Sequence, residues 1–285
     1  MIEVITATPA TGVVYRHAHM PSQFIEPRHV DVWCPPGFGS DAAARYPVIY
    51  MQDGQNLFDP ALANTGVDWG VAEAITRLHA EGDIPAPIVV GVWCTANRRR
   101  EYMPQKPLET PAARALSARF AQEWEGAPIS DAYLRFLVEE LKPFMDASYP
   151  TLPGQPSTFI MGSSMGGLLS LYALIEYPHL FGGAGCLSTH WPIGGSLLVD
   201  ALGAALPPPA THKLYFDFGT TTLDADYEPY QRRMDSWMAA AGYTMGQNWL
   251  TRKFTGADHS ETAWRARVHI PLQFLLGQDA RSRRP

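Results

Sequence analysis

The sequence predicts an α/β protein, with a mostly parallel central sheet, helices on both faces and antiparallel strands at the N-terminal edge. Short apolar runs alternate along the chain with segments whose apolar residues recur three and four positions apart, as in repeated strand–helix units. The central apolar runs are nearly continuous, which is typical of strands buried on both faces. The first strand-like segments instead alternate apolar and polar residues, as half-exposed antiparallel strands do.

Each predicted element follows from its local pattern. We expect two antiparallel strands at 12–20 and 28–36, and a short strand within 185–190. Buried strands are expected at 46–54, 88–95, 157–163 and 214–220, with a less clear strand at 248–256. Helical spacing predicts helices near 69–80, 131–145, 165–177, 230–241 and 260–276. Pro178, Gly242 and Gly277 supply stop signals for the last three.

The length of 285 residues suits one large α/β domain, which we expect over 1–277, with a flexible tail at 278–285. One segment interrupts the alternation of strands and helices. Residues 97–129 are polar, contain prolines and lie between a predicted strand and a predicted helix. Long excursions of this kind in compact domains are often functional, so the segment is a candidate lid or substrate loop.

Composition narrows the classes of partner. A net charge of −6 argues against nucleic-acid binding, and no apolar run is long enough to span a membrane. The N-terminus shows no signal-peptide pattern, so we expect a cytoplasmic protein. Three widely separated cysteines fit a reducing compartment and offer no zinc-site spacing. We expect no metal and no cofactor, and the oligomeric state stays open.

The stretch "FIMGSSMGGL", residues 159–168, contains the pattern G-x-S-x-G centred on Ser164. It joins a predicted buried strand to a predicted helix, where a sharp turn leaves little room for side chains at positions 162 and 166. Glycine at both positions meets that need, and the turn would expose the serine hydroxyl near a helix N-terminus. Ser163 lacks glycines at these offsets. Ser164 is therefore the predicted nucleophile, against the alternative of a plain glycine-rich turn.

A serine nucleophile needs a histidine base, which follows it in the chain order of such sites. Five histidines follow Ser164: His179, His190, His212, His259 and His269. His259 lies between the last predicted strand and the last predicted helix, at the carboxyl edge of the sheet. His179 and His212 belong to the opposite edge, and His269 lies inside a helix. His259 is the predicted base, and His190 is a candidate pocket residue.

The orienting acid should lie just after the strand "LYFDFGT". Asp224 and Asp226 both follow it, and either could instead cap the next helix. We favour Asp224 because it is nearer the strand end, with Asp226 second and Asp217, inside the strand, third.

Oxyanion donors are expected at two backbone positions. One is the N–H of Met165, which follows the nucleophile. The other is the N–H of Gln55 in "MQDGQNLFDP", where Gly54 allows close approach. An ordinary Asp-Gly turn is the alternative reading of that loop.

Several motifs together resemble a known family. They run in order over about residues 46–276: "YMQDGQNLFDP", "GVDWGVAEAI", "VVGVWCT", "REYMP", "IMGSSMGGLLSLYAL", "GTTTLDADYEPYQ" and "GADHSETAWRARV". The set is similar to the esterase branch of the α/β-hydrolase superfamily, with its enterochelin-esterase-like, feruloyl-esterase-like and esterase D-like enzymes. The resemblance implies an α/β-hydrolase fold and cleavage of a carboxylic ester. It assigns Ser164 as nucleophile, His259 as base, and Met165 and Gln55 as oxyanion donors. Some relatives work with a Ser-His pair, so the acid is the least fixed member.

The expected function is a serine esterase acting on a small-molecule ester through an acyl-enzyme and a Ser-His-Asp triad. An acyltransferase on the same site and a catalytically idle binding module are the alternatives. The sequence does not name the acyl group or the alcohol. Candidate substrate-binding residues are Trp69, Arg99, Tyr102, His190 and Trp191. Instead of binding substrate, the run Arg98–Arg100 could be a solvated charge cluster, and the aromatic residues could pack in the core.

Overall fold

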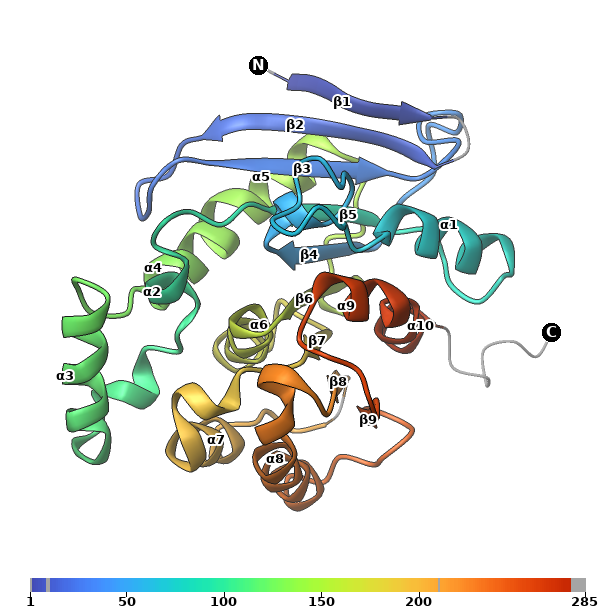
Figure 1. Ribbon diagram of the computed structural model, residues 1–285. Coiled ribbons are helices and arrows are strands. Elements are labelled where there is room, and N and C mark those ends of the chain that lie inside the picture. Colours follow the sequence, from blue (N-terminus) through green and yellow to red (C-terminus); the bar gives the residue numbers. More distant parts are fainter. Residues whose placement is uncertain (1, 9–10, 210, 278–285) are drawn as a thin grey trace.

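A computed structural model describes residues 2–8, 11–209 and 211–277 (Figure 1). Within them, nine strands form one sheet in the order β1-β2-β3-β5-β4-β6-β7-β8-β9. The strands are β1 (Ile2–Thr8), β2 (Gly12–Met20), β3 (Arg28–Cys34), β4 (Val48–Gln52), β5 (Ile88–Val92), β6 (Thr158–Ser163), β7 (Gly183–Leu187), β8 (Lys213–Phe218) and β9 (Trp249–Lys253). From β5 to β9 all neighbouring strands are parallel. The predicted α/β fold class is confirmed.

The N-terminal edge of the sheet is antiparallel and larger than predicted. β2 pairs antiparallel with β1 on one side and with β3 on the other. β3 joins the parallel part of the sheet through an antiparallel pairing with β5. The sequence predicted β2 and β3 but not β1. Glu3 and Val4 are both exposed, so β1 carries little of the alternating burial that reveals a strand.

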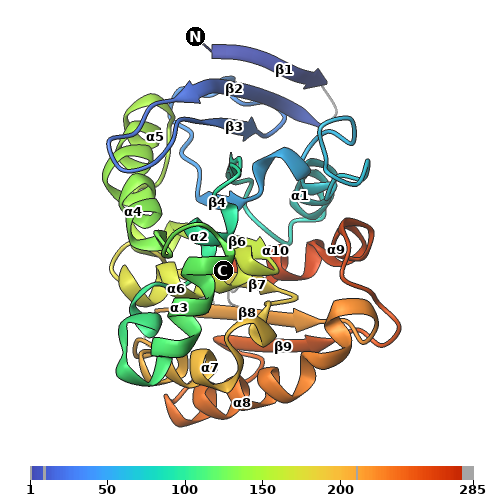
Figure 2. The ribbon, with the colours of Figure 1, turned by 60° about the vertical axis from the view of Figure 1, so that its left-hand side comes forward.

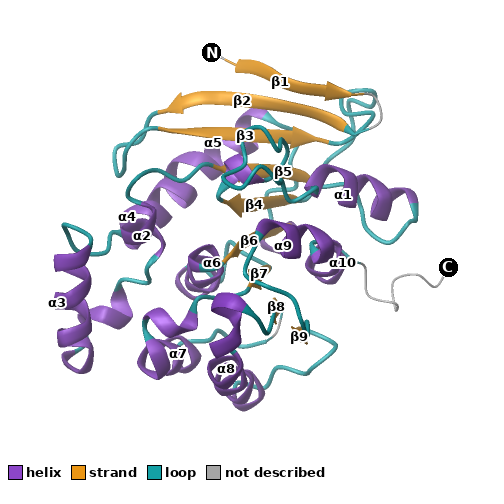
Figure 3. Cartoon of the chain, in the orientation of Figure 1, coloured by secondary structure: helices purple, strands orange, loops and turns teal. Residues whose placement is uncertain are grey.

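Helices cover both faces of the sheet (Figures 2 and 3). One face packs on α1 (Val71–Ala80), α9 (Glu261–Arg267) and α10 (His269–Leu276). The other face packs on α4 (Ser130–Arg135), α5 (Lys142–Ser148), α6 (Met165–Glu176), α7 (Gly195–Ala204) and α8 (Glu228–Ala240). A π-helical stretch, Phe136–Leu141, joins α4 to α5. Both layers bury the continuous apolar strands that the sequence pattern indicated.

The structure differs from the predicted helices at two places. The single helix expected at 260–276 is broken at Val268 into α9 and α10. Pro271 explains the break, since proline has no N–H to donate to the carbonyl four residues earlier. Helix α7 was not predicted, although four of its residues are buried: Leu198, Val199, Leu202 and Gly203.

The segment 97–129 is largely helical rather than an open loop. It contains α2 (Arg98–Tyr102), the 3-10 turns Lys106–Glu109 and Pro111–Ala113, and α3 (Arg114–Glu123). In Figure 2 these elements lie in front of α6, near the N-terminus of that helix. A buried ion pair between Arg28 on β3 and Glu101 on α2, 2.6 Å, ties the segment to the sheet. The predicted single-domain boundary at 277 stays a prediction, and the predicted tail at 278–285 lies outside the described residues.

Candidate active site

Ser164 stands on a strained turn between β6 and α6. Its backbone has φ 56° and ψ −122°, in the left-handed region that side-chain-bearing residues rarely adopt. Of the two flanking glycines, Gly162 is sterically required and Gly166 is tightly packed. A Cβ on Gly162 would lie 2.8 Å from the backbone of Gly166, and one on Gly166 would lie 3.1 Å from the Cβ of Gln52. The turn thus presents Ser164 at the carboxyl edge of the parallel strands, as its sequence pattern predicted.

His259 and Asp224 meet at the same edge. Nδ1 of His259 and Oδ1 of Asp224 are 2.6 Å apart, and the two side chains are 9% and 0% exposed. His259 follows β9, and its backbone N–H donates to Oγ1 of Thr222, which fixes its loop against the loop after β8. Residues 35 positions apart in sequence are therefore held in the contact that a base and its orienting acid would need.

The second oxygen of Asp224 is also fully engaged. Oδ2 accepts hydrogen bonds from the Ser188 hydroxyl and from the Gly219 N–H, each at 2.6 Å. Burial alone would raise the pKa of Asp224, but the hydrogen bonds from His259, Ser188 and Gly219 outweigh it and lower that pKa. Asp224 is thereby kept as a carboxylate that can stabilise a protonated imidazole.

The other acid candidates lie in different surroundings. Asp217 is buried and forms an ion pair with Arg267, 2.9 Å, while its other oxygen accepts from the Tyr215 hydroxyl. Asp226 is exposed. Of the three aspartates, it is Asp224 that contacts His259.

Ser164 and His259 both lie next to Tyr227. The rings of Tyr227 and His259 meet edge-to-face with centroids 5.7 Å apart, and the Ser164 hydroxyl interacts with the Tyr227 hydroxyl. Across the described residues no direct hydrogen bond joins Ser164 to His259, and such bonds are often long before substrate binds. Tyr227 carries no local sequence signal, since it reads as one more residue of the turn before α8, and the sequence did not identify it.

The two predicted oxyanion donors, Met165 and Gln55, lie at the start of α6 and in the turn after β4. Met165 is the first residue of α6, so its N–H has no acceptor within that helix. Gln55 lies in the short turn Gly54–Asn56, and its side chain donates to Sγ of Cys94 at 3.0 Å. A Cβ on Gly54 would lie 2.4 Å from the backbone of Gly91, so only glycine allows this approach of the loop to β5. The side-chain amide of Gln55 is thus fixed, and among the described residues no acceptor takes its backbone N–H.

A pocket of about 270 Å³ opens beside Ser164. It is lined by Ser164, Met165 and His190, by Arg98, Arg99, Arg119 and Glu123, and by Phe120, Trp124, Ile193 and Leu223. Arg98 is neutralised by Asp53 at 2.6 Å, whereas in the part of the chain that the structure describes the Arg99 guanidinium has neither an ion pair nor a hydrogen bond. The Phe120 and Trp124 rings stack at 4.3 Å. The pocket therefore combines an aromatic wall with a free positive charge.

The substrate candidates from the sequence separate into two groups. Arg99 and His190 line this pocket. Trp69, Tyr102 and Trp191 are buried in the protein interior and do not line it. Trp69 packs against Trp264, which in turn packs edge-on against His259. Tyr102 lies under the Arg98 guanidinium. All three aromatic side chains are buried, so the alternative reading of core packing describes their position.

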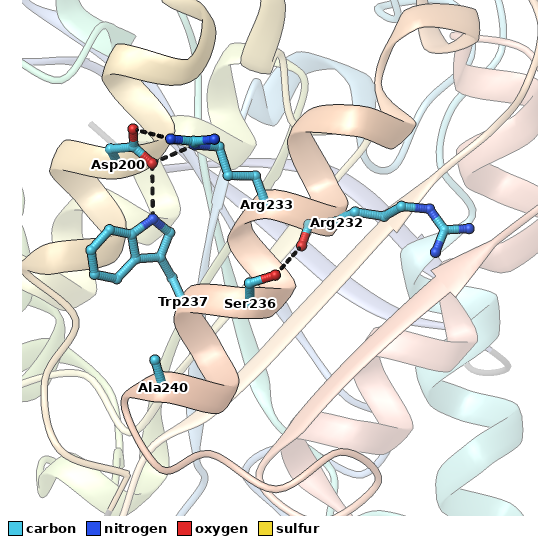
Figure 4. A pocket seen from close by; sticks show the side chains of 6 residues that line it. All are labelled: Asp200, Arg232, Arg233, Ser236, Trp237 and Ala240. Atoms are coloured by element: carbon cyan, nitrogen blue, oxygen red, sulfur yellow. Dashed lines mark hydrogen bonds and ion pairs between the residues drawn. The ribbon is translucent and has the colours of Figure 1, made fainter.

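A second hollow, of about 640 Å³, lies between α7 and α8 (Figure 4). Two of its charged groups are paired with each other, since both oxygens of Asp200 accept from Arg233 and one also accepts from Trp237. Arg232 is paired with Glu228, which is not part of the lining. The Ser236 hydroxyl donates to the backbone carbonyl of Arg232. Among the described residues that line the hollow, none is a base next to Ser236, so it has no counterpart of the His259–Asp224 pair.

The described residues offer neither a metal-binding cluster nor a membrane-spanning helix. Over residues 2–8, 11–209 and 211–277, no three His, Cys, Asp or Glu side chains are grouped as a metal ion would require. The same residues contain no helix that is both long enough and apolar enough to cross a membrane.

Comparison with known proteins gives a consistent result. A family model named Esterase, described as "Putative esterase", matches residues 22–272. YbbA of Bacillus subtilis, which is uncharacterised, is 27% identical over 58% of each chain. The ferri-bacillibactin esterase BesA of the same species is 29% identical over 52% of this chain and 50% of its own. The chain spans between 50% and 60% of the length of the curated relatives it matches.

The solved structures agree on the fold. An IroE-like serine hydrolase from Shewanella oneidensis superposes with a TM-score of 0.67 at 17% identity, covering 92% of this chain and 78% of that one. This likeness confirms the α/β-hydrolase architecture that the motifs implied.

Proposed function

Because the chain belongs to the Esterase family, we propose that it is a serine-dependent carboxylic ester hydrolase that forms an acyl-enzyme on Ser164. The observation that carries the proposal is the 2.6 Å contact between His259 and the buried carboxylate of Asp224, at the sheet edge that presents Ser164. A histidine held in this way has one ring nitrogen fixed by the acid and the other available to take a proton.

In the proposed reaction, His259 takes the hydroxyl proton of Ser164 as the serine oxygen attacks the ester carbonyl carbon. The tetrahedral intermediate places its negative oxygen at the N–H groups of Met165 and Gln55. His259 then gives its proton to the departing alcohol oxygen, which leaves an acyl group on Ser164. Water, deprotonated by His259, attacks that acyl group and returns the free acid and the serine.

Asp224 supports both proton transfers. Since it remains a carboxylate, it stabilises the imidazolium that forms when His259 is protonated. The N-terminus of α6 points its free N–H groups and partial positive charge at the developing oxyanion. Both effects stabilise charge that exists in the transition state and not in the bound ester, which is the condition for raising turnover.

For the substrate, we propose a small ester that carries an aromatic ring or a negative charge. The Phe120–Trp124 stack and the unpaired Arg99 guanidinium in the pocket support this class. Arg99 is exposed, so we expect it to select among substrates rather than to hold one tightly.

The test is covalent labelling of the intact protein with a fluorophosphonate, followed by mass measurement and by assays on short-chain p-nitrophenyl esters. We expect one adduct and ester turnover in the wild type, and neither in Ser164→Ala. The matched control is Ser163→Ala, which removes the neighbouring hydroxyl and should keep the adduct. A folded wild-type protein with no adduct and no turnover would contradict the proposal and favour a binding module of hydrolase fold.

A further inference from the structure

His190 and Tyr227 form a hydrogen-bonded pair beside the proposed nucleophile. Nδ1 of His190 and the Tyr227 hydroxyl oxygen are 2.5 Å apart. The pair is anchored to the turn between β6 and α6, since the His190 backbone N–H donates to the carbonyl of Ser164 at 3.2 Å. Tyr227 is 1% exposed, whereas His190 lines the pocket. The proposed reaction steps use neither side chain.

The chemistry of the two groups decides which one donates. Burial raises the pKa of Tyr227, so it stays a phenol with a single hydrogen to give. An uncharged imidazole nitrogen is a much stronger base than a phenol oxygen. The favourable arrangement is therefore Tyr227 O–H donating to Nδ1 of His190. In a neutral imidazole, the remaining ring hydrogen must then be on Nε2.

The surroundings keep His190 neutral. Burial lowers its pKa most, followed by the nearby His259 and Arg98, and the result is about 4. Asp224 opposes this shift and Arg99 adds to it. At neutral pH, His190 is thus an uncharged donor at the pocket wall.

Within the ranges that the structure describes, the His190 ring forms its hydrogen bond through Nδ1, and its Nε2 has no hydrogen-bond partner. A polar N–H at the wall of the pocket that contains Ser164 needs an acceptor when bound substrate excludes water. The leaving alcohol oxygen is not this acceptor, because it takes its proton from His259. The acceptor must therefore be another oxygen of the ester, in the part that lies near both Ser164 and His190.

We propose that His190 donates a hydrogen bond from Nε2 to an oxygen of the bound ester, with Tyr227 as the positioning residue that fixes its tautomer. The pair makes the site prefer esters with an ether, hydroxyl or carbonyl oxygen close to the scissile bond. This substrate preference rests on the proposed esterase function, whereas the tautomer does not.

The tautomer can be measured without any substrate. Protein labelled with ¹⁵N-histidine gives two-bond ¹H–¹⁵N correlations that distinguish Nδ1–H from Nε2–H, and His190→Gln assigns the signal. We expect the Nε2–H form of His190 at pH 7, and a mixture of both forms in Tyr227→Phe, which keeps the ring but lacks the hydroxyl. An Nδ1–H form or an imidazolium in the wild type would overturn the proposal.

The preference is measured with matched esters in which an ether oxygen replaces one methylene. Suitable pairs are p-nitrophenyl methoxyacetate with p-nitrophenyl butyrate, and 2-methoxyethyl butyrate with butyl butyrate. In His190→Leu we expect kcat/KM for an ether ester to fall about tenfold further than for its alkyl partner, the cost of one neutral hydrogen bond. The loss should appear mainly in KM, because such a bond holds ground state and transition state alike.

His190→Gln is the rescue variant, since its amide can still donate, and we expect it to recover part of the preference. Equal losses for ether and alkyl partners in every pair would overturn the proposed contact. Failure of the esterase proposal looks different, because Ser164 would then take no fluorophosphonate label while the histidine signal could still be measured.

Discussion

At the scale of single residues, Ser188 supports Asp224 through the carboxylate oxygen that His259 does not contact. Its hydroxyl donates to Oδ2 of Asp224 and accepts from Nη2 of Arg267 at 2.7 Å and Nε1 of Trp264 at 3.1 Å. Its backbone is strained, with φ 41°. We expect Ser188→Ala to lower kcat by about tenfold and stability by about 1–3 kcal/mol, because the carboxylate loses a donor and two buried donors lose their acceptor.

The measurement is kcat for a p-nitrophenyl ester together with urea unfolding. Ser170→Ala is the matched control, since Ser170 is equally buried but only returns its hydroxyl to the Gly166 carbonyl within α6. If both variants lose the same activity, the effect of Ser188 is general packing and not support of Asp224.

The residue scale also shows what sequence can predict about a site. Ser164 could be named as a candidate because a sharp turn needs glycines at fixed offsets in the same short stretch. His259 and Asp224 could be named as candidates from their order in the chain and the strand ends that they follow, and the structure brings these two together. Ser188 and Tyr227 had no such signal, because their roles arise from contacts between loops that are distant in sequence. Buried partners of this kind follow only from the three-dimensional structure.

At the scale of elements, the turn Gly54–Asn56 and helix α2 act as one unit. Asp53, just before the turn, has a left-handed backbone with φ 55° and forms two hydrogen bonds with Arg98, at 2.6 and 2.8 Å. Arg98→Met would leave the Asp53 charge buried without its partner and free the loop that carries the Gln55 N–H. We expect kcat to fall by about 10- to 100-fold, less than the roughly 100- to 1,000-fold cost of a deleted oxyanion donor, because the donor is displaced and not removed.

Arg100→Met provides the control from the same helix. Arg100 is half-buried and bonds to the carbonyl of Ala127 and the side chain of Asn97, away from Asp53. Fluorophosphonate labelling should slow in Arg98→Met and stay close to wild type in Arg100→Met. Equal labelling rates in the two variants would argue against Arg98 as a support of the oxyanion loop.

A strand or helix could be predicted where its buried residues repeat with the period of that element. The buried strands β4, β5, β6 and β8 appear where continuous apolar runs predicted them. β1 was missed because Glu3 and Val4 are both exposed and give no alternating pattern. The break between α9 and α10 was missed because apolar spacing continues across it. The segment 97–129 was expected to be a long loop, but tertiary contacts such as the Arg28–Glu101 ion pair hold it in short helices that few local signals announce.

At the scale of the whole molecule, acid stability should reflect histidines that folding keeps neutral. Burial lowers the pKa of His17, His29 and His269 in the folded protein, and it lowers that of His190 to about 4. Unfolding returns each histidine to an ordinary pKa near 6.5. Between these values the unfolded chain binds more protons than the folded one, so stability rises with pH in this window.

The stabilising contribution of neutral His190 is therefore complete above pH 6.5 and is lost as pH falls toward about 4, where both states are protonated. Replacing it with glutamine removes the titration but leaves His17, His29 and His269 in place. We expect Tm, measured by scanning calorimetry from pH 8 to pH 4.5, to fall less on acidification in His190→Gln than in the wild type. Above pH 7 the two curves should run parallel, because His190 is then neutral in both states. Parallel curves through the acid range would mean that His190 is not held neutral by the fold, which would also remove the basis for its role as an uncharged donor in the pocket.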